Sequence, residues 1–143
     1  MKVRIKLNWD TPMPEYETSW AVAFDLRAIM DYTIEPGKMV MVDTWVAIEI
    51  PEGYYLQLQS RSSTFKKHWL VLVNWVWIID NDYCWDNDTQ KFQYMNFWDK
   101  TEIIEKWTRI GQAVFVKCMK AEFDVVETLW HEDRGWFWTT WIK

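Results

Sequence analysis

The chain has 143 residues, a formal net charge of −5 and two cysteines, and this length suits one domain with a core of its own. The negative charge argues against a general nucleic-acid or membrane partner, because both favour a basic surface. Cys84 and Cys118 lack the spacing of a metal site or a disulfide framework, which fits a reducing compartment. The first residues show no apolar signal region and no segment approaches the ~18 apolar residues of a membrane span, so we expect a cytoplasmic protein.

Alternation of apolar and polar residues with a period of two dominates the chain and predicts β-strands. Turn signals such as Glu35-Pro-Gly37 separate these segments at the short spacing of a sandwich or barrel. Residues 62–68 predict one short helix with a serine cap. The expected fold is all-β with one small helix, in a single domain of residues 1–143 whose residues 131–143 form a flexible closing tail. In chain order, the predicted strands cover residues 2–7, 39–42, 46–50, 54–60, 91–96 and 113–117.

Five short motifs follow one another along the chain. They are Ala23-Phe-Asp-Leu-Arg-Ala28, Ser60-Arg-Ser-Ser63, Asn74-x-Val-x-Ile-Ile-Asp-Asn-Asp-Tyr83, Thr108-Arg-Ile-Gly-Gln-Ala113 and the tail motif Arg134-Gly-x-Phe-x-Thr-Thr, where each x is a tryptophan. Together they resemble AGFDLRA, PRSS, NGVGIIDxDY, DRIAQ and RGxGGFGSTG, the motifs of the trimeric dUTP pyrophosphatases (dUTPases). The resemblance covers nearly the whole chain, and it implies a dUTPase-like β-barrel of the jelly-roll or β-clip kind that assembles as a homotrimer.

The resemblance also implies a phosphate site built from separate segments. Arg61, Ser62 and Ser63 would bind the phosphates, and an arginine beside the hydroxyls and N–H groups of a helix N-terminus does suit an anion. Gln112 would contact a phosphate or position water, while Arg109 would support the site or the trimer centre. Taken alone, the serines are an ordinary helix cap, and the ordered set of motifs is what favours the phosphate role.

By the same resemblance, the third and fifth motifs would hold the base and the sugar. Asn74 would contact uracil beside a hairpin backbone that mimics a pairing base, and Tyr83 would pack under the deoxyribose and exclude a 2′-hydroxyl. Asp80 would be the general base that deprotonates the water attacking the α-phosphorus. In the tail, Phe137 would stack on uracil and Arg134 would bind the phosphates as the tail closes over a site formed by neighbouring subunits.

The expected substrate is therefore dUTP and the expected cofactor is Mg²⁺. The sequence has no cluster of several carboxylates, which fits a magnesium ion held largely by substrate oxygens and waters. Asp25 would help to hold this ion through water. Two departures from the family motifs weaken the resemblance locally, because Ser60 replaces a proline and Thr108 replaces an acidic residue.

The chain has thirteen tryptophans and only four glycines, although turns depend on glycine for positive φ. Read with glycine in place of tryptophan, residues 74–80 become NGVGIID and residues 134–143 become RGGFGTTGIK. Trp45, Trp69, Trp85 and Trp107 fall at further positions where the resembled family carries glycine. One hypothesis is a decoding effect, since the codon UGA is read as tryptophan in one variant code and as glycine in another. The alternatives are a designed or heavily mutated variant, or real tryptophans in a buried core.

Trp77 matters most for function, because an indole at this hairpin position would fill the uracil pocket. Two other functions therefore stay open. One is an impaired or designed trimer whose tryptophans block the pocket. The other is a deaminase of the same fold acting on dCTP, whose motif has a further arginine and a catalytic glutamate that are not evident in residues 62–67. Under the decoding hypothesis, we expect several tryptophans to be exposed or to have strained backbones.

Overall fold

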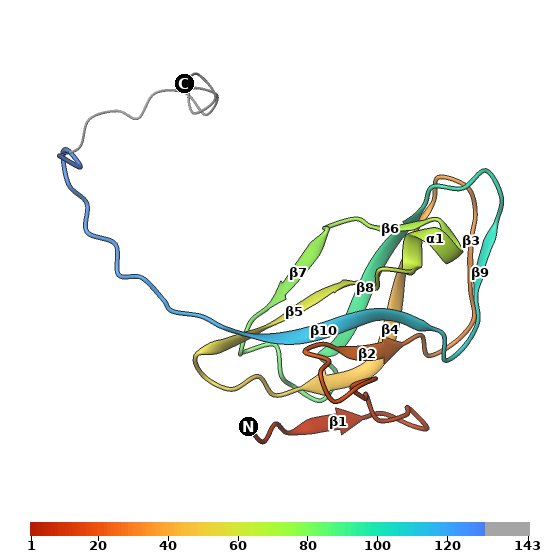
Figure 1. Cartoon of the computed structure of the whole chain (residues 1–143), viewed down its shortest axis with the longest axis horizontal. Coiled ribbons are helices and arrows are strands. Elements are labelled where there is room, and N and C mark those ends of the chain that lie inside the picture. The colour runs from red at the N-terminus through yellow and green to blue at the C-terminus, as the bar shows by residue number, and fades with distance from the viewer. Residues whose placement is uncertain (131–143) are drawn as a thin grey trace.

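The computed structural model describes residues 1–130, and within this range the chain forms ten strands and one short helix (Figure 1). The all-β prediction with one helix is confirmed. The elements are β1 (Ile5–Leu7), β2 (Phe24–Arg27), β3 (Tyr32–Ile34), β4 (Met39–Ile48), β5 (Tyr54–Ser60), α1 (Thr64–His68), β6 (Leu70–Leu72), β7 (Val76–Ile79), β8 (Thr89–Asn96), β9 (Glu102–Ile104) and β10 (Arg109–Lys117).

The strands form two four-stranded antiparallel sheets around one apolar core. One sheet has the order β1-β4-β8-β6, the other has the order β2-β10-β5-β7, and β3 and β9 form a separate two-stranded ribbon. Alternate residues along the long strands face inward, as expected for sheets with one face on the core. The largest fully buried side chains come from both sheets and include Leu26, Ile48, Leu56, Leu58, Phe92, Tyr94 and Ile110.

The strands predicted at residues 39–42 and 46–50 are one strand, β4. Its pairing with β8 shifts register between Asp43 and Ala47, and Trp45 within this irregularity has a φ of 53°. The N–H of Trp45 donates to Asp43 Oδ1 at 2.9 Å, so the local backbone is held by a side chain where the ladder is interrupted. The predicted strand at residues 54–60 coincides with β5.

The predicted helix is present, but its serine cap works differently from the prediction. Ser63 is the residue before the helix, yet its side chain makes no capping hydrogen bond, because it has a helical backbone conformation with φ −90° and ψ −10°. The predicted side-chain cap is therefore wrong. At the other end, Trp69 ends the helix in the left-handed conformation, with its N–H donating to the Phe65 carbonyl at 2.8 Å.

Every non-glycine residue with positive φ in the described range is a tryptophan. The six are Trp9, Trp45, Trp69, Trp75, Trp107 and Trp130, with φ between 52° and 66°. Trp9, Trp20, Trp75, Trp85 and Trp130 are also at least 75% exposed. Among the tryptophans for which exposure or strain was expected, Trp75 shows both and Trp85 is exposed, whereas Trp77 is half-buried without a positive φ. The others, at positions 136, 138 and 141, lie outside the described residues.

Beyond β10, residues 118–130 lead away from the body without forming a helix or strand (Figure 1). The predicted closing tail of residues 131–143, with Arg134 and Phe137, lies outside the described residues. Across residues 1–130, the structure contains no helix with the length and apolar character needed to cross a membrane.

Candidate functional site

A buried aspartate joins two arginines at the edge where β2 and β5 flank β10. Asp25 in β2 is 8% exposed, and its carboxylate accepts hydrogen bonds from Arg61 Nε at 2.8 Å and from Arg109 Nη1 at 3.4 Å. β10 pairs with both β2 and β5, which brings Arg109 at its start and Arg61 just after β5 to the same carboxylate. The topology therefore gathers three residues of three different sequence motifs.

Gln112 and Ser60 lie beside this cluster. Gln112 is opposite Asp25 on one side and Gln59 on the other, and its Nε2 donates to the Ser60 carbonyl at 3.3 Å. The Ser60 hydroxyl lies 3.2 Å from the Tyr94 hydroxyl, which itself donates to the Ile110 carbonyl at 2.7 Å. Burial raises the pKa of Tyr94 to about 12. The serine that replaces the family proline is thus tied to the core.

Ser62 and Ser63 follow Arg61 at the start of α1. Ser62 is exposed and Ser63 is half-buried, and the N–H of Thr64 donates to the Arg61 carbonyl at 3.0 Å. Because the Ser63 side chain does not cap the helix, its hydroxyl is free to bind a ligand. Arg61, Ser62 and Ser63 therefore lie together in one turn, as predicted.

Glu17 also belongs to this cluster, although no sequence motif pointed to it. Its carboxylate forms an ion pair with Arg109. The hydrogen bond from Arg109 lowers the pKa of Glu17, and the same contact raises the pKa of Arg109. A cavity of about 360 Å³ opens here, and it is lined by Asp10, Pro12, Met13, Glu15, Glu17, Asp25, Arg27 and Trp107.

A second group of predicted residues lies at the end of β7. Trp77, Asp80 and Tyr83 line one cavity of about 340 Å³ together with neighbouring residues of this segment and with Thr89 and Lys91 of β8. Asp80 is exposed, and its carbonyl accepts the N–H of Tyr83 at 3.3 Å. The Tyr83 hydroxyl donates to the Thr89 carbonyl at 3.2 Å. The predicted base and the predicted sugar-facing tyrosine therefore share a pocket.

Asn81 fixes this turn, although the sequence indicated no role for this residue of the third motif. Its Nδ2 lies within 2.9 to 3.0 Å of three carbonyl oxygens, those of Ile50, Pro51 and Tyr54. These acceptors lie in the connection between β4 and β5 and at the first residue of β5, far away in sequence. Asn81 therefore anchors the Asp80 turn to the neighbouring sheet edge, a role that only the tertiary structure reveals.

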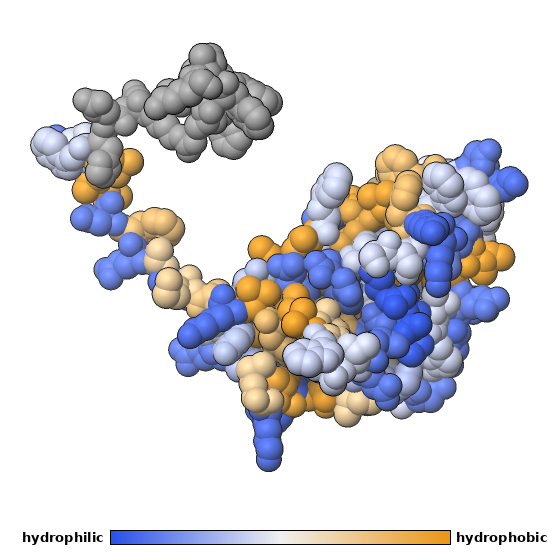
Figure 2. Space-filling view, in the orientation of Figure 1, coloured by the Kyte–Doolittle hydropathy of each residue, from blue (hydrophilic) through white to orange (hydrophobic). Residues whose placement is uncertain are grey.

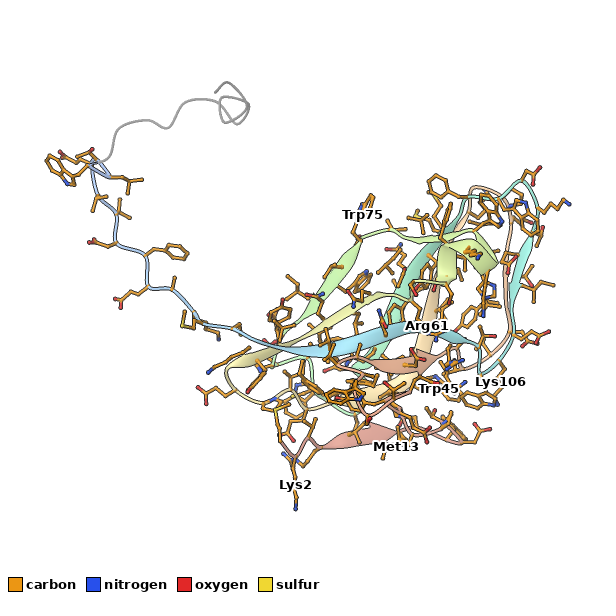
Figure 3. All side chains as sticks on the ribbon, in the orientation of Figure 1. Lys2, Met13, Trp45, Arg61, Trp75 and Lys106 are labelled. Carbon is orange, nitrogen blue, oxygen red and sulfur yellow. The ribbon has the colours of Figure 1, made fainter. Side chains whose placement is uncertain are left out.

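Asn74 lies just before β7 and Trp77 lies within it. Asn74 is exposed and precedes Trp75, which lies at the outer end of β7 (Figure 3). Trp77 is half-buried, pairs with Leu58 of β5 and packs against the edge of the core. Its indole N–H is buried without a hydrogen-bond partner among residues 1–130, an arrangement that costs on the order of 1–3 kcal/mol.

The two groups of predicted residues do not meet within one chain. β7 pairs with β5 so that Ile79 lies opposite Leu56 and Val76 lies opposite Gln59. Asp80 therefore lies near one end of β5, while Arg61 follows the other end. At the rise of a strand, this separation is roughly 16–20 Å. We call the Asp80–Tyr83 pair and the Arg61 cluster the two half-sites, whereas Asn74, two residues before Val76, lies on the Arg61 side of this register.

The dUTPase family model matches residues 10–136. The chain belongs to the dUTPase family. It is 37% identical to the deoxyuridine 5′-triphosphate nucleotidohydrolase of Nautilia profundicola over 94% of each chain, and 37% identical to that of Hydrogenobaculum sp. over the full length of both. The structure is similar to that of the dUTPase from Streptococcus mutans, with a TM-score of 0.77 and 31% identity, over 83% of this chain and 98% of that one.

This member of the dUTPase family has no cage for a metal ion in its described part. Residues 1–130 contain no group of three or more His, Cys, Asp or Glu side chains that could hold one. Each carboxylate oxygen of Asp25 accepts one hydrogen bond from an arginine. A second lone pair on each oxygen can accept a hydrogen bond from a metal-bound water. The donor set thus fits an ion that arrives with the substrate.

Proposed function

We propose that this chain hydrolyses dUTP to dUMP and pyrophosphate, with Asp80 as the general base that activates the attacking water. The observation that carries the proposal is the shared pocket of Asp80 and Tyr83 in a chain of the dUTPase family. Asp80 is exposed and can reach a water, whereas Tyr83 is held in place through its hydroxyl. The fixed ring of Tyr83 beside Asp80 suits the exclusion of a substrate that has a 2′-hydroxyl.

The arginine cluster supplies the complementary half of the site. Arg61, Ser62, Ser63 and Gln112 would bind the phosphates, because guanidinium, hydroxyl and amide groups are the donors that phosphate oxygens accept. Asp25 orients Arg61 through its Nε, which leaves the two Nη groups of Arg61 for a ligand. Mg²⁺ would neutralise the charge of the triphosphate when bound, with Asp25 contacting it through water.

We also propose that the active unit is a homotrimer, since the two half-sites are separated along β5. Neighbouring copies can bring the Asp80 half of one chain to the Arg61 half of another. Exposed apolar side chains on the body, among them Met39, Met41 and Ile78, are available for contacts between copies. Figure 2 shows apolar side chains interspersed with polar ones on the face in view. The arm of residues 118–130 adds further exposed apolar side chains, including Phe123 and Val125.

A mixing experiment tests the shared site. Asp80→Asn and Arg61→Ala are each expected to inactivate the enzyme alone. After joint refolding, random trimers should recover about one quarter of the wild-type rate, because that fraction of sites has both native halves. Light scattering gives the assembly state. No recovery in mixed trimers would show that each site belongs to one chain.

We further propose that the tryptophans at positive φ stand where the natural protein has glycine, through UGA codons read with the wrong table. The support is the backbone, since all six such residues are tryptophan. A non-glycine residue in this conformation costs about 1–2 kcal/mol, and six sites together approach the whole stability of a typical domain, about 5–15 kcal/mol. UGG or GGN codons at these positions would contradict the proposal.

Asp80→Asn, made with glycine at the tryptophan positions, tests the reaction itself. The change keeps size and polarity but removes the proton acceptor, so hydrolysis should be nearly abolished while a non-hydrolysable dUTP analogue still binds. Asp82→Asn is the matched control, because Asp82 lines the same cavity and has no proposed role. Hydrolysis by Asp80→Asn within a few-fold of the parent would refute the assignment.

Incubation with dCTP tests the alternative function, a deaminase of the same fold that acts on dCTP. The helix after Ser63 contains Thr64, Phe65 and two lysines but no arginine or glutamate, so we expect no deamination. Formation of dUTP or dUMP from dCTP would reverse this conclusion.

We also propose that the reaction takes place in the cytoplasm, since both cysteines are free thiols.

A further inference from the structure

Glu17 is an exposed carboxylate that lies among arginines. It pairs with Arg109, and the positive charges of Arg61 and Arg27 also help to lower its pKa. Arg61 and Arg109 already share the buried carboxylate of Asp25, and Arg27 donates to the Trp107 carbonyl at 3.0 Å. Glu17 is therefore the second anion of a cluster with three guanidinium groups.

The chemistry of this contact is that of a bound phosphate. Arginine recognises carboxylate and phosphate oxygens with the same fork of N–H donors. Arg109 uses Nη1 for both Glu17 and Asp25. A further anion that approaches Nη1 of Arg109 from solvent competes with Glu17, because Asp25 is buried and Glu17 is about half exposed.

The backbone around Glu17 allows such a displacement. The residue lies between β1 and β2 in a segment without helix or strand. The segment is tied on both sides of Glu17, where the Glu15 carbonyl accepts the Asp25 N–H at 3.2 Å and the Thr18 carbonyl accepts the Ala21 N–H at 3.1 Å. The carboxylate can leave Arg109 by side-chain rotation, without opening a sheet.

We propose that Glu17 is an internal counter-ion of the arginine cluster, which a phosphate group of the substrate displaces from Arg109. This proposal rests on the proposed function for the identity of the ligand. Glu17 lowers the affinity for polyphosphates in the resting enzyme, and it favours product release because it pairs again with Arg109 once pyrophosphate leaves. It is a positioning residue, since it acts through Arg109.

The test compares Glu17→Gln with Glu15→Gln, each in the full chain, both as printed and with glycine at the positive-φ tryptophans. The two changes remove the same charge from the same segment and cavity lining, but within residues 1–130 Glu15 forms no ion pair with an arginine. Calorimetry with inorganic pyrophosphate should show about two- to fivefold tighter binding for Glu17→Gln, as expected for a half-exposed ion pair. Glu15→Gln should bind like the parent.

Kinetic constants measured together with thermal stability separate the counter-ion role of Glu17 from a purely structural role. For Glu17→Gln we expect a lower KM for dUTP and stronger inhibition by pyrophosphate, with thermal unfolding close to that of the parent. Glu17→Ala should behave in the same way, since the lost group is the carboxylate. Unchanged or weaker pyrophosphate binding in both Glu17 variants, or equal tightening in Glu15→Gln, would overturn the proposal.

The pyrophosphate measurement needs no turnover, so the two proposals fail separately. Absence of dUTP hydrolysis together with the expected shift in pyrophosphate affinity would defeat the proposed reaction and leave the counter-ion in place. Hydrolysis without that shift would defeat the counter-ion alone.

Discussion

Replacing Trp75 with glycine should stabilise the protein, because the residue has a φ of 58° and is 82% exposed. Its N–H donates to the Leu72 carbonyl at 3.0 Å, and glycine can keep this bond in the same turn. Glycine removes the left-handed penalty of about 1–2 kcal/mol, and the exposed indole contributes little burial to lose. We therefore expect the free energy of unfolding to rise by about 1 kcal/mol, measured by urea titration at unchanged slope.

Trp85→Gly is the matched control. Trp85 is 75% exposed and does not have a positive φ, so glycine relieves no strain there and adds backbone entropy to the unfolded chain. The free energy of unfolding should stay constant or fall by about 0.5–1 kcal/mol. If Trp75→Gly gives no gain, or if both variants change stability equally, the argument from backbone strain is refuted.

Three further changes probe the second half-site and the core. Tyr83→Ala should raise the kcat/KM of UTP relative to that of dUTP, because space opens for the 2′-hydroxyl, and an unchanged ratio would place sugar selection elsewhere. Asn81→Ala removes the two N–H donors of an amide nitrogen that lies near three carbonyl oxygens and should lower the free energy of unfolding by about 1–3 kcal/mol, whereas an unchanged urea midpoint would show that the Asp80 turn is held without it. Tyr94 has a pKa raised by burial to about 12, above its ordinary value of ~10; its contribution to stability is complete below pH ~10 and is lost as the pH rises towards ~12. Tyr94→Phe should therefore be less stable near neutral pH yet show a flatter alkaline loss by circular dichroism, and parallel pH curves for the two proteins would contradict this.

The sequence predicted the parts of the fold that depend on local pattern. β5 coincides with its predicted range because seven residues alternate cleanly, and β8 and β10 extend their predicted cores by a few residues. The helix α1, Thr64–His68, lies within the range 62–68 that was predicted as helical. The three-residue strands β3, β6 and β9 were not predicted from alternation, because so short a segment carries too little pattern and gains its strand conformation from its partners.

The candidate site was predictable only where a motif marks it. Asp25, Arg61 and Gln112 lie together because β10 pairs with both neighbouring strands, and the motifs had named all three. Glu17 and Asn81 act through partners that are distant in sequence, so their roles depend on tertiary contacts alone. The resemblance implied a site formed by neighbouring subunits, but the register between β5 and β7 is what puts Asp80 and Arg61 at opposite ends of β5.

Backbone geometry gives a criterion for glycine that is independent of the motifs. The chain uses its described glycines in two ways, because Gly37 and Gly53 have positive φ while a Cβ on Gly111 would lie 2.2 Å from the Phe92 ring. The resemblance to the family and the backbone agree on glycine at positions 45, 69, 75 and 107.

The two criteria disagree elsewhere, and the disagreement is informative. Trp9 has a φ of 55° but lies in none of the five motifs, whereas Trp77 occupies a motif glycine position within β7 without a positive φ. A misread UGA codon should appear at both positions, because decoding depends on the gene and not on the fold. UGA at position 77 but UGG at position 9 would mean that Trp9 is a true residue that tolerates its strain. The coding sequence at these two positions therefore separates a decoding error from an amino-acid choice that the backbone alone cannot distinguish.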